Sequence, residues 1–169
     1  MKKLLATVIA TYCGLGLSPK APGTVGSLGT LPLALALLHF GGVTALLLAA
    51  WIICIIGIWA TDKIIREQED KDPGKVVVDE VVGQLLAFSL LPDFIWQQID
   101  SLSLIVLLLG FAFFRLFDIC KKGPVKWFDS KMKNACGVMF DDVCAGFLAA
   151  ICLASIYYAY VYVIMYYAS

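Results

Sequence analysis

The feature that most constrains this chain is an almost unbroken apolar stretch from Val25 to Thr61, interrupted only at residues 39–42. A helix that crosses the hydrocarbon core of a bilayer needs about 20 residues. The stretch is too long for one crossing, and the glycine pair Gly41-Gly42 is typical of a turn. The sequence therefore predicts two membrane-spanning helices that are joined at this pair.

Three more apolar runs follow, at residues 76–91, 102–117 and 138–167. The whole chain is 61% hydrophobic and 15% charged, whereas soluble proteins average about 45–50% apolar and about 25% charged residues. We therefore expect an all-α fold, a polytopic membrane helical bundle with about five spans, forming one membrane-embedded domain over residues 1–169. Residues 4–17 predict a short N-terminal helix that is interfacial or re-entrant.

The basic residues predict the orientation of this bundle. Every Lys and Arg lies in the N-terminal region, in the loop at residues 62–75 or around the connector at residues 115–137. The loops at residues 39–42 and 92–103 contain none. Because basic loops stay in the cytoplasm, the N-terminus is expected inside and the C-terminus outside.

The same orientation puts three groups of acidic residues on the cytoplasmic side. Gly83 follows Glu80 by three residues, and Gly146 follows Asp142 by four, so each glycine shares a helix face with a carboxylate. Small residues let helices approach closely in membranes. We therefore expect the carboxylates to converge, and the candidate catalytic and metal-ligating residues are Asp79, Glu80, Asp118, Asp141 and Asp142.

Carboxylates gathered in a small space repel one another and cannot all stay ionised without a compensating charge. A divalent cation supplies that charge, and Mg²⁺ prefers carboxylate oxygens, water and phosphate as ligands. The alternative is that these side chains only end helices at the interface, paired with Lys and Arg. Arg115 lies three residues before Asp118 on the same helix face, and under this alternative it would pair with that carboxylate.

A Pro- and Gly-rich loop at residues 17–27 precedes the first apolar run. Its backbone N–H groups, with Lys20, Thr24 and Ser27, predict an anion site at a helix N-terminus. An ordinary helix cap explains Thr24 and Ser27 equally well. The spacing does not match the phosphate-binding loop of nucleotide-binding proteins.

Other site chemistries are excluded by what the sequence contains. The six cysteines form no Cys-x-x-Cys pair and are expected as small buried residues. No cysteine is followed six positions later by arginine, so the Cys-x5-Arg loop of one class of phosphatases is absent. The single histidine, His39, falls at the opposite end from the acidic groups, which excludes histidine-based catalysis beside them. A net charge of zero gives no electrostatic case for a nucleic-acid partner.

Four linked motifs together resemble the phosphatidylglycerophosphatase A family. They are residues 16–27, residues 76–83, residues 114–124 and residues 137–146, in the family's order and over nearly the whole chain. The chain departs from the family pattern at Lys122, where proline is usual, and at Asn134 and Ala135, where glycines are common.

The resemblance implies a bacterial inner-membrane phosphatase that requires Mg²⁺ and converts phosphatidylglycerophosphate to phosphatidylglycerol at the cytoplasmic face. On this hypothesis the acidic residues hold the metal and activate water, and Arg115 and Lys121 clamp the phosphate, with Lys20, Thr24 and Ser27 completing the pocket. Two rival hypotheses remain: a phosphotransferase that joins a lipid to an alcohol, and a small membrane cation carrier.

Overall fold

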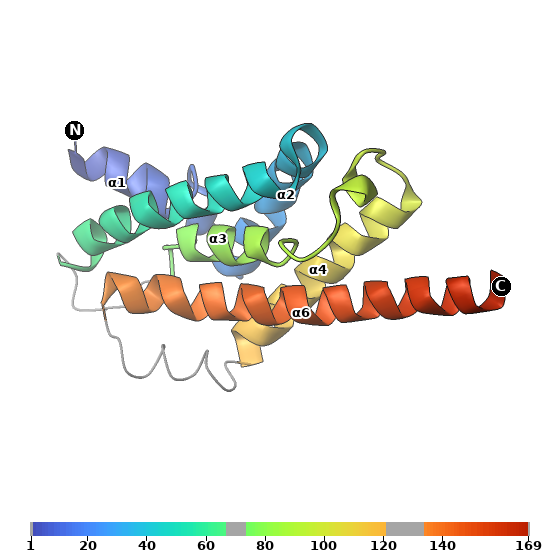
Figure 1. The fold of residues 1–169 in the computed structure, drawn as a ribbon. Coiled ribbons are helices and arrows are strands. Elements are labelled where there is room, and N and C mark those ends of the chain that lie inside the picture. The colour runs from blue at the N-terminus through green and yellow to red at the C-terminus, as the bar shows by residue number, and fades with distance from the viewer. Residues whose placement is uncertain (1, 67–73, 121–133, 169) are drawn as a thin grey trace.

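A computed structural model describes residues 2–66, 74–120 and 134–168, and all its regular elements are helices (Figure 1). The longer ones are α1 (Lys2–Ala10), α2 (Pro22–Ile65), α3 (Val78–Leu86), α4 (Ser101–Cys120) and α6 (Ala135–Ala168). Two short 3-10 helices, η1 (Leu15–Leu17) and η2 (Asp93–Trp96), lie between them. Lys121, a predicted phosphate ligand, lies outside the described residues.

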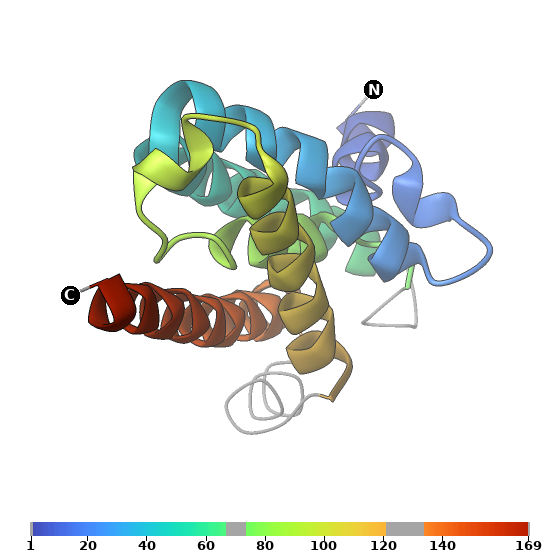
Figure 2. The same cartoon turned by 90° about the vertical axis from the view of Figure 1, so that its right-hand side faces the viewer.

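The expected turn at the glycine pair is confirmed. Gly42 has φ 65° and ψ −168°, which breaks α2 into two arms that run back along each other (Figures 1 and 2). This left-handed φ favours glycine. The Asp93 carboxylate accepts a hydrogen bond from the Val43 N–H at 2.7 Å, and His39 Nδ1 donates to the Trp96 carbonyl at 2.9 Å. These contacts tie η2 to the turn of α2.

Three of the described helices, α2, α4 and α6, are long and apolar enough to cross a membrane. Their outward faces carry large apolar side chains, such as Trp51 and Ile55 on α2 and Leu108 on α4, each about 60% exposed or more. Exposed apolar surface on this scale is expected where lipid, rather than water, surrounds the helices.

The expectation of a span-length helix over residues 76–91 is wrong. The helix there, α3, has nine residues and is almost wholly buried among the longer helices. Beyond it, residues 87–100 run as turns and η2 toward the turn of α2, and Phe88 and Trp96 are fully buried and pack edge to face. Irregular backbone is tolerated at membrane depth when protein surrounds it.

The helices α3 and α6 cross with their backbones in close contact. A Cβ added at Gly146 would touch the backbone of Gly83, and one added at Gly83 would meet the carbonyl of Asp142 and the ring of Phe114. No larger residue fits between these backbones, as in other small-residue contacts of membrane helices. This crossing fixes the start of α3 against the start of α6.

The N-terminal helix α1 is short, as expected. Nine residues are too few to cross a bilayer, and α1 packs against α2. Its last carbonyl, on Ala10, accepts a hydrogen bond from the N–H of Val77 at 2.8 Å, directly before α3. All six cysteines are free, but the expectation that they are small buried residues is wrong for Cys13 and Cys120, which are exposed; Cys54 is buried and the other three are half-buried.

Candidate active site

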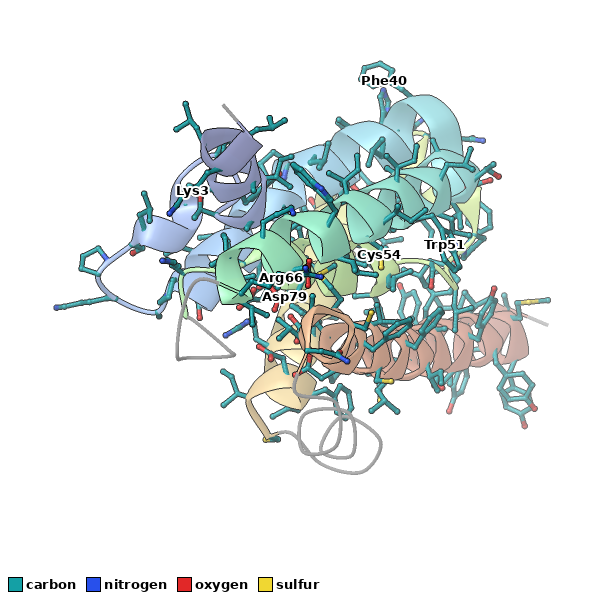
Figure 3. The ribbon with its side chains drawn as sticks, turned by 90° about the vertical axis from the view of Figure 1, so that its left-hand side faces the viewer. Lys3, Phe40, Trp51, Cys54, Arg66 and Asp79 are labelled. Atoms are coloured by element: carbon teal, nitrogen blue, oxygen red, sulfur yellow. The ribbon has the colours of Figure 1, made fainter. Side chains whose placement is uncertain are left out.

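A polar cavity of about 350 Å³ lies where α2, α3 and α6 begin and α4 ends. Figure 3 views the bundle from this end and shows Asp79 close to the start of α6. Its ionisable lining residues are Asp79, Glu80, Arg115, Asp118, Asp141 and Asp142. The structure therefore brings together five carboxylates and one guanidinium from three helices that are far apart in sequence.

The carboxylates of α3 and α6 form the tightest group. One oxygen from each of Asp79, Glu80 and Asp142 lies within 4.8 Å of the others. Asp79 and Asp142 are buried, at 7% and 3% exposed. Asp141 is also buried, and its carboxylate accepts a hydrogen bond from the N–H of Asp142 at 3.0 Å.

The sequence of α3 and α6 explains why these groups meet. Glu80 precedes Gly83 by about one helical turn, as Asp142 precedes Gly146. Because the two glycine backbones are in contact, the residues one turn earlier on each helix are brought to the same level. The crossing thus turns two separate acidic pairs into one cluster.

Among the described residues that line this cavity, Arg115 on α4 is the one with a cationic side chain. Its Nη1 forms a salt bridge with Asp118 on the same helix face and lies 4.0 Å from Glu80 Oε1. The same nitrogen donates a long hydrogen bond, 3.4 Å, to the Ser27 hydroxyl of α2. Arg115 therefore connects α2, α3 and α4 at one point.

The first turn of α2 forms another wall of the cavity. Ala21, Pro22 and Gly23 line it, and Ala21 is held in the left-handed region at φ 46°. A Cβ added at Gly23 would overlap the Glu80 carboxylate and come within 3.2 Å of Arg115. The positive end of the helix dipole and the free N–H groups of this turn therefore face the charged residues.

The donor set fits a hard divalent cation. Asp79 Oδ1 and Glu80 Oε2 are buried and have no hydrogen-bond partner among the described residues. Buried polar atoms normally have a partner, and an unpaired buried carboxylate is costly. A cation such as Mg²⁺, which is bound by carboxylate oxygens, would satisfy both atoms.

Comparison with known proteins identifies the relatives of this chain. A sequence profile of the phosphatidylglycerophosphatase A family matches residues 8–157. The chain belongs to the phosphatidylglycerophosphatase A family. Membership places it among the phosphatases, enzymes that hydrolyse phosphate monoesters. No solved structure matches the chain.

The curated relatives of this family member span most of its length. Phosphatidylglycerophosphatase A of Haemophilus influenzae is 36% identical over 151 residues, covering 89% of this chain and 88% of the relative. Phosphatidylglycerophosphatase A of Escherichia coli is 32% identical over 143 residues, covering 85% and 78%. A Bacteroides thetaiotaomicron protein, provisionally named a phosphatidylinositol-3-phosphatase, is 36% identical over 157 residues, covering 89% and 92%.

In this phosphatidylglycerophosphatase A family member, the predicted substrate-binding residues are distributed unevenly. Arg115 lines the cavity, and Ser27 contacts it. Thr24 lies in the first turn of α2 next to Gly23 but is not among the lining residues, and Lys20 is exposed in the preceding loop. The Ser27 hydroxyl also donates to the Gly23 carbonyl at 2.8 Å, so it stabilises the first turn of α2 as well.

Several lining residues were not predicted individually. Gly23 was part of a recognised motif, but only the structure shows that Glu80 occupies the space of its missing side chain. Ala21 belongs to the same motif, but its left-handed conformation was not predicted, since alanine seldom adopts one. Ile119 lies just after the apolar run at residues 102–117 and was given no role of its own, yet it lines the cavity beside Asp118.

Proposed function

We propose that this enzyme removes the terminal phosphate of phosphatidylglycerophosphate, producing phosphatidylglycerol and phosphate, in a reaction that depends on Mg²⁺. One observation carries the proposal: five carboxylates and an arginine line a single cavity at a helix N-terminus. Family membership supplies the substrate, because relatives from two bacteria carry the name of this activity.

Asp79, Glu80 and Asp142 are the proposed primary metal ligands, since their oxygens already lie within 4.8 Å of one another. Asp118 and Asp141 line the same cavity and are the remaining candidates for ligand or general base. When bound, Mg²⁺ acts as a Lewis acid that stabilises charge on the phosphoryl oxygens and favours ionisation of water. The carboxylates orient the attacking water and accept its proton.

Arg115 and the first turn of α2 are the proposed phosphate-binding groups. A guanidinium binds two phosphate oxygens at once, and the N–H groups of a helix N-terminus favour an anion. Arg115 forms a salt bridge with Asp118 in the structure, and a bound phosphate would replace that carboxylate as its partner. Ser27 orients Arg115 in this arrangement, and Lys20, Thr24 and Lys121 are proposed to complete the headgroup site.

The proposed orientation places this cavity at the cytoplasmic face of the bacterial inner membrane. All basic residues lie in segments at the cavity end of the predicted topology, as the positive-inside rule requires. The two arms of α2, the segment comprising α3 and residues 87–100, then α4 and α6, would make about five passes. This count is a proposal, because among the described helices α2, α4 and α6 alone have the length of a span.

The test is phosphate release by purified protein from vesicles containing phosphatidylglycerophosphate. We expect turnover with Mg²⁺, none after chelation, and a loss of at least a hundredfold in Asp142→Asn with the protein still inserted. The same assay with phosphatidylinositol 3-phosphate examines the activity for which the Bacteroides relative is named. Release from neither lipid would reject the proposal, and transfer or ion flux without phosphate release would favour the rival functions.

A further inference from the structure

The cavity reaches the surface of the bundle on the side where α2 begins and α4 ends. Ile119 lines the cavity, yet its side chain is 68% exposed on the outer surface of α4. Across from it, Ala21 is exposed and Pro22 is half-buried, and both line the same cavity. Because these residues line the cavity and are also exposed, the cavity opens to the surface of the bundle between them.

One turn deeper the two helices are joined. Arg115 Nη1 donates to the hydroxyl of Ser27 across the seam, and Gly23 is packed against Arg115 and Glu80. The opening is therefore confined to the first turn of α2 and the last turn of α4. It leads sideways from the cavity and does not continue down through the bundle.

The outer surface beside this opening is apolar. Leu28 is 53% exposed and follows Ala21 by seven residues, so both lie on one face of α2. Leu116 is 52% exposed and precedes Ile119 by three residues on α4. The joined seam is thus bordered by apolar side chains that extend from the opening toward the middle of the bundle.

Two apolar hollows elsewhere in the described structure lack this connection. One lies between α4 and α6 and includes Leu109 and Leu153, and the other lies between α2, α3 and α6 and includes Trp51 and Phe140. Neither shares a lining residue with the acidic cavity. At Ile119, in contrast, the acidic cavity adjoins the apolar outer surface of the described bundle.

We propose that the gap between Ala21-Pro22 and Ile119 is a lateral portal for one phospholipid. The phosphorylated headgroup and the lipid's glycerol backbone occupy the cavity, and the acyl chains pass Ile119 into the bilayer, where they lie along Leu28 and Leu116. This inference rests on the proposed function, because it concerns access of that substrate to the same cavity. A lateral portal lets the headgroup reach the carboxylates without moving the acyl chains into water, which would be costly.

The test compares two substrates with the same headgroup. One is phosphatidylglycerophosphate in vesicles, and the other is its water-soluble deacylated form, which needs no passage for acyl chains. In the full-length protein, Ile119→Trp should narrow the portal and reduce kcat/KM for the lipid at least tenfold, while that for the deacylated substrate changes less than twofold. Ile119→Ala, which widens the gap, should keep the lipid activity.

Leu108→Trp is the matched control, because Leu108 is 59% exposed on the same helix and does not line the cavity. It should leave both activities unchanged. An equal loss for both substrates in Ile119→Trp would overturn the portal and make Ile119 part of the headgroup site. Unchanged lipid activity in that variant would also overturn it. If the unaltered protein hydrolysed neither substrate, the proposed function itself would fail, and the portal with it.

Discussion

At the scale of single residues, the site depends on positions without a side chain, which leave space for the charged groups to lie close together. Gly23 is the sharpest case, because a side chain there would occupy the volume of the Glu80 carboxylate. Glu80 in turn lies 4.0 Å from Arg115, whose nitrogen also contacts Asp118 and Ser27. A displacement of Glu80 is therefore transmitted to the only described guanidinium of the cavity.

Gly23→Ala is expected to lower kcat about a hundredfold, because a misplacement of roughly 1 Å in a catalytic site has an effect of that size. The variant should also bind Mn²⁺ more weakly, measured by electron paramagnetic resonance with Mn²⁺ as the probe ion. Gly57→Ala in the same helix is the control, since its new Cβ meets only apolar side-chain atoms, the end of Met139 at 3.0 Å and a methyl group of Val78 at 3.2 Å. Wild-type activity in Gly23→Ala would show that Glu80 does not need its present position.

At the scale of elements, the contact between α3 and α6 determines whether a site exists at all. Gly83 and Gly146 bring two helix backbones together, and the acidic residues one turn before them form the cluster. The crossing also packs Phe114 of α4 against Gly83, so α4 and its Arg115 are positioned by the same point. Three helices thus depend on one small-residue contact.

Gly146→Ala tests the close contact between α3 and α6, because this contact and the helix propensity of alanine predict opposite changes in stability. Alanine in place of glycine inside a helix should stabilise the protein by about 1 kcal/mol if nothing else changes. Because the new Cβ would meet the backbone of Gly83, we expect instead a loss of about 1–3 kcal/mol, as for other overpacked sites. Thermal unfolding in detergent measures the sign, and a raised Tm would contradict the close crossing.

The sequence predicted the long helices correctly but overestimated the length of α3, and the reasons are physical. Hydropathy located the long helices, and the glycine pair at residues 41 and 42 located the turn of α2. The short helix α3 was overestimated, because a segment buried among other helices is as apolar as one exposed to lipid. The convergence of the carboxylates followed from charge and small-residue spacing, whereas the positions of Ala21 and Ile119 depend on backbone conformation and on neighbouring helices.

At the scale of the whole molecule, a metal ion should act as a structural link. The carboxylates that we propose as ligands come from both α3 and α6, and two of their oxygens lack partners among the described residues. A ligand that binds only the folded state stabilises it by about 2.7 kcal/mol at a hundred times its Kd. Binding should therefore resist separation of these helices.

Saturating Mg²⁺ is expected to raise Tm by roughly 5–10 °C, given about 2–4 °C per kcal/mol for a chain of this size. The rise should disappear in Asp142→Asn, which removes one of the three clustered carboxylates. Ca²⁺ and Na⁺ serve as comparison ions for selectivity and for ionic strength. An equal rise in Asp142→Asn would place the ion elsewhere on the molecule.

The arrangement of the whole bundle places the cavity and a group of exposed tyrosines at opposite ends of α6. The cavity lies at the end where α6 begins, and α6 has 34 residues, a length on the order of 50 Å. Its far part projects beyond the other helices in Figure 1 and carries exposed tyrosines, such as Tyr160 and Tyr162. Tyrosines gather at membrane interfaces, so these tyrosines are expected to mark the interface opposite the cavity.

Labelling with a membrane-impermeant maleimide tests this orientation. Cys120 is exposed at the cavity end, and Phe40 is 86% exposed beside the turn of α2 at the other end. With all other cysteines replaced, Cys120 should react only after the cells are permeabilised, because the proposed orientation places its end of the bundle in the cytoplasm. A cysteine-free protein carrying Phe40→Cys should react in intact cells. The reverse pattern would place the carboxylates outside the cytoplasm and contradict a reaction at the inner leaflet.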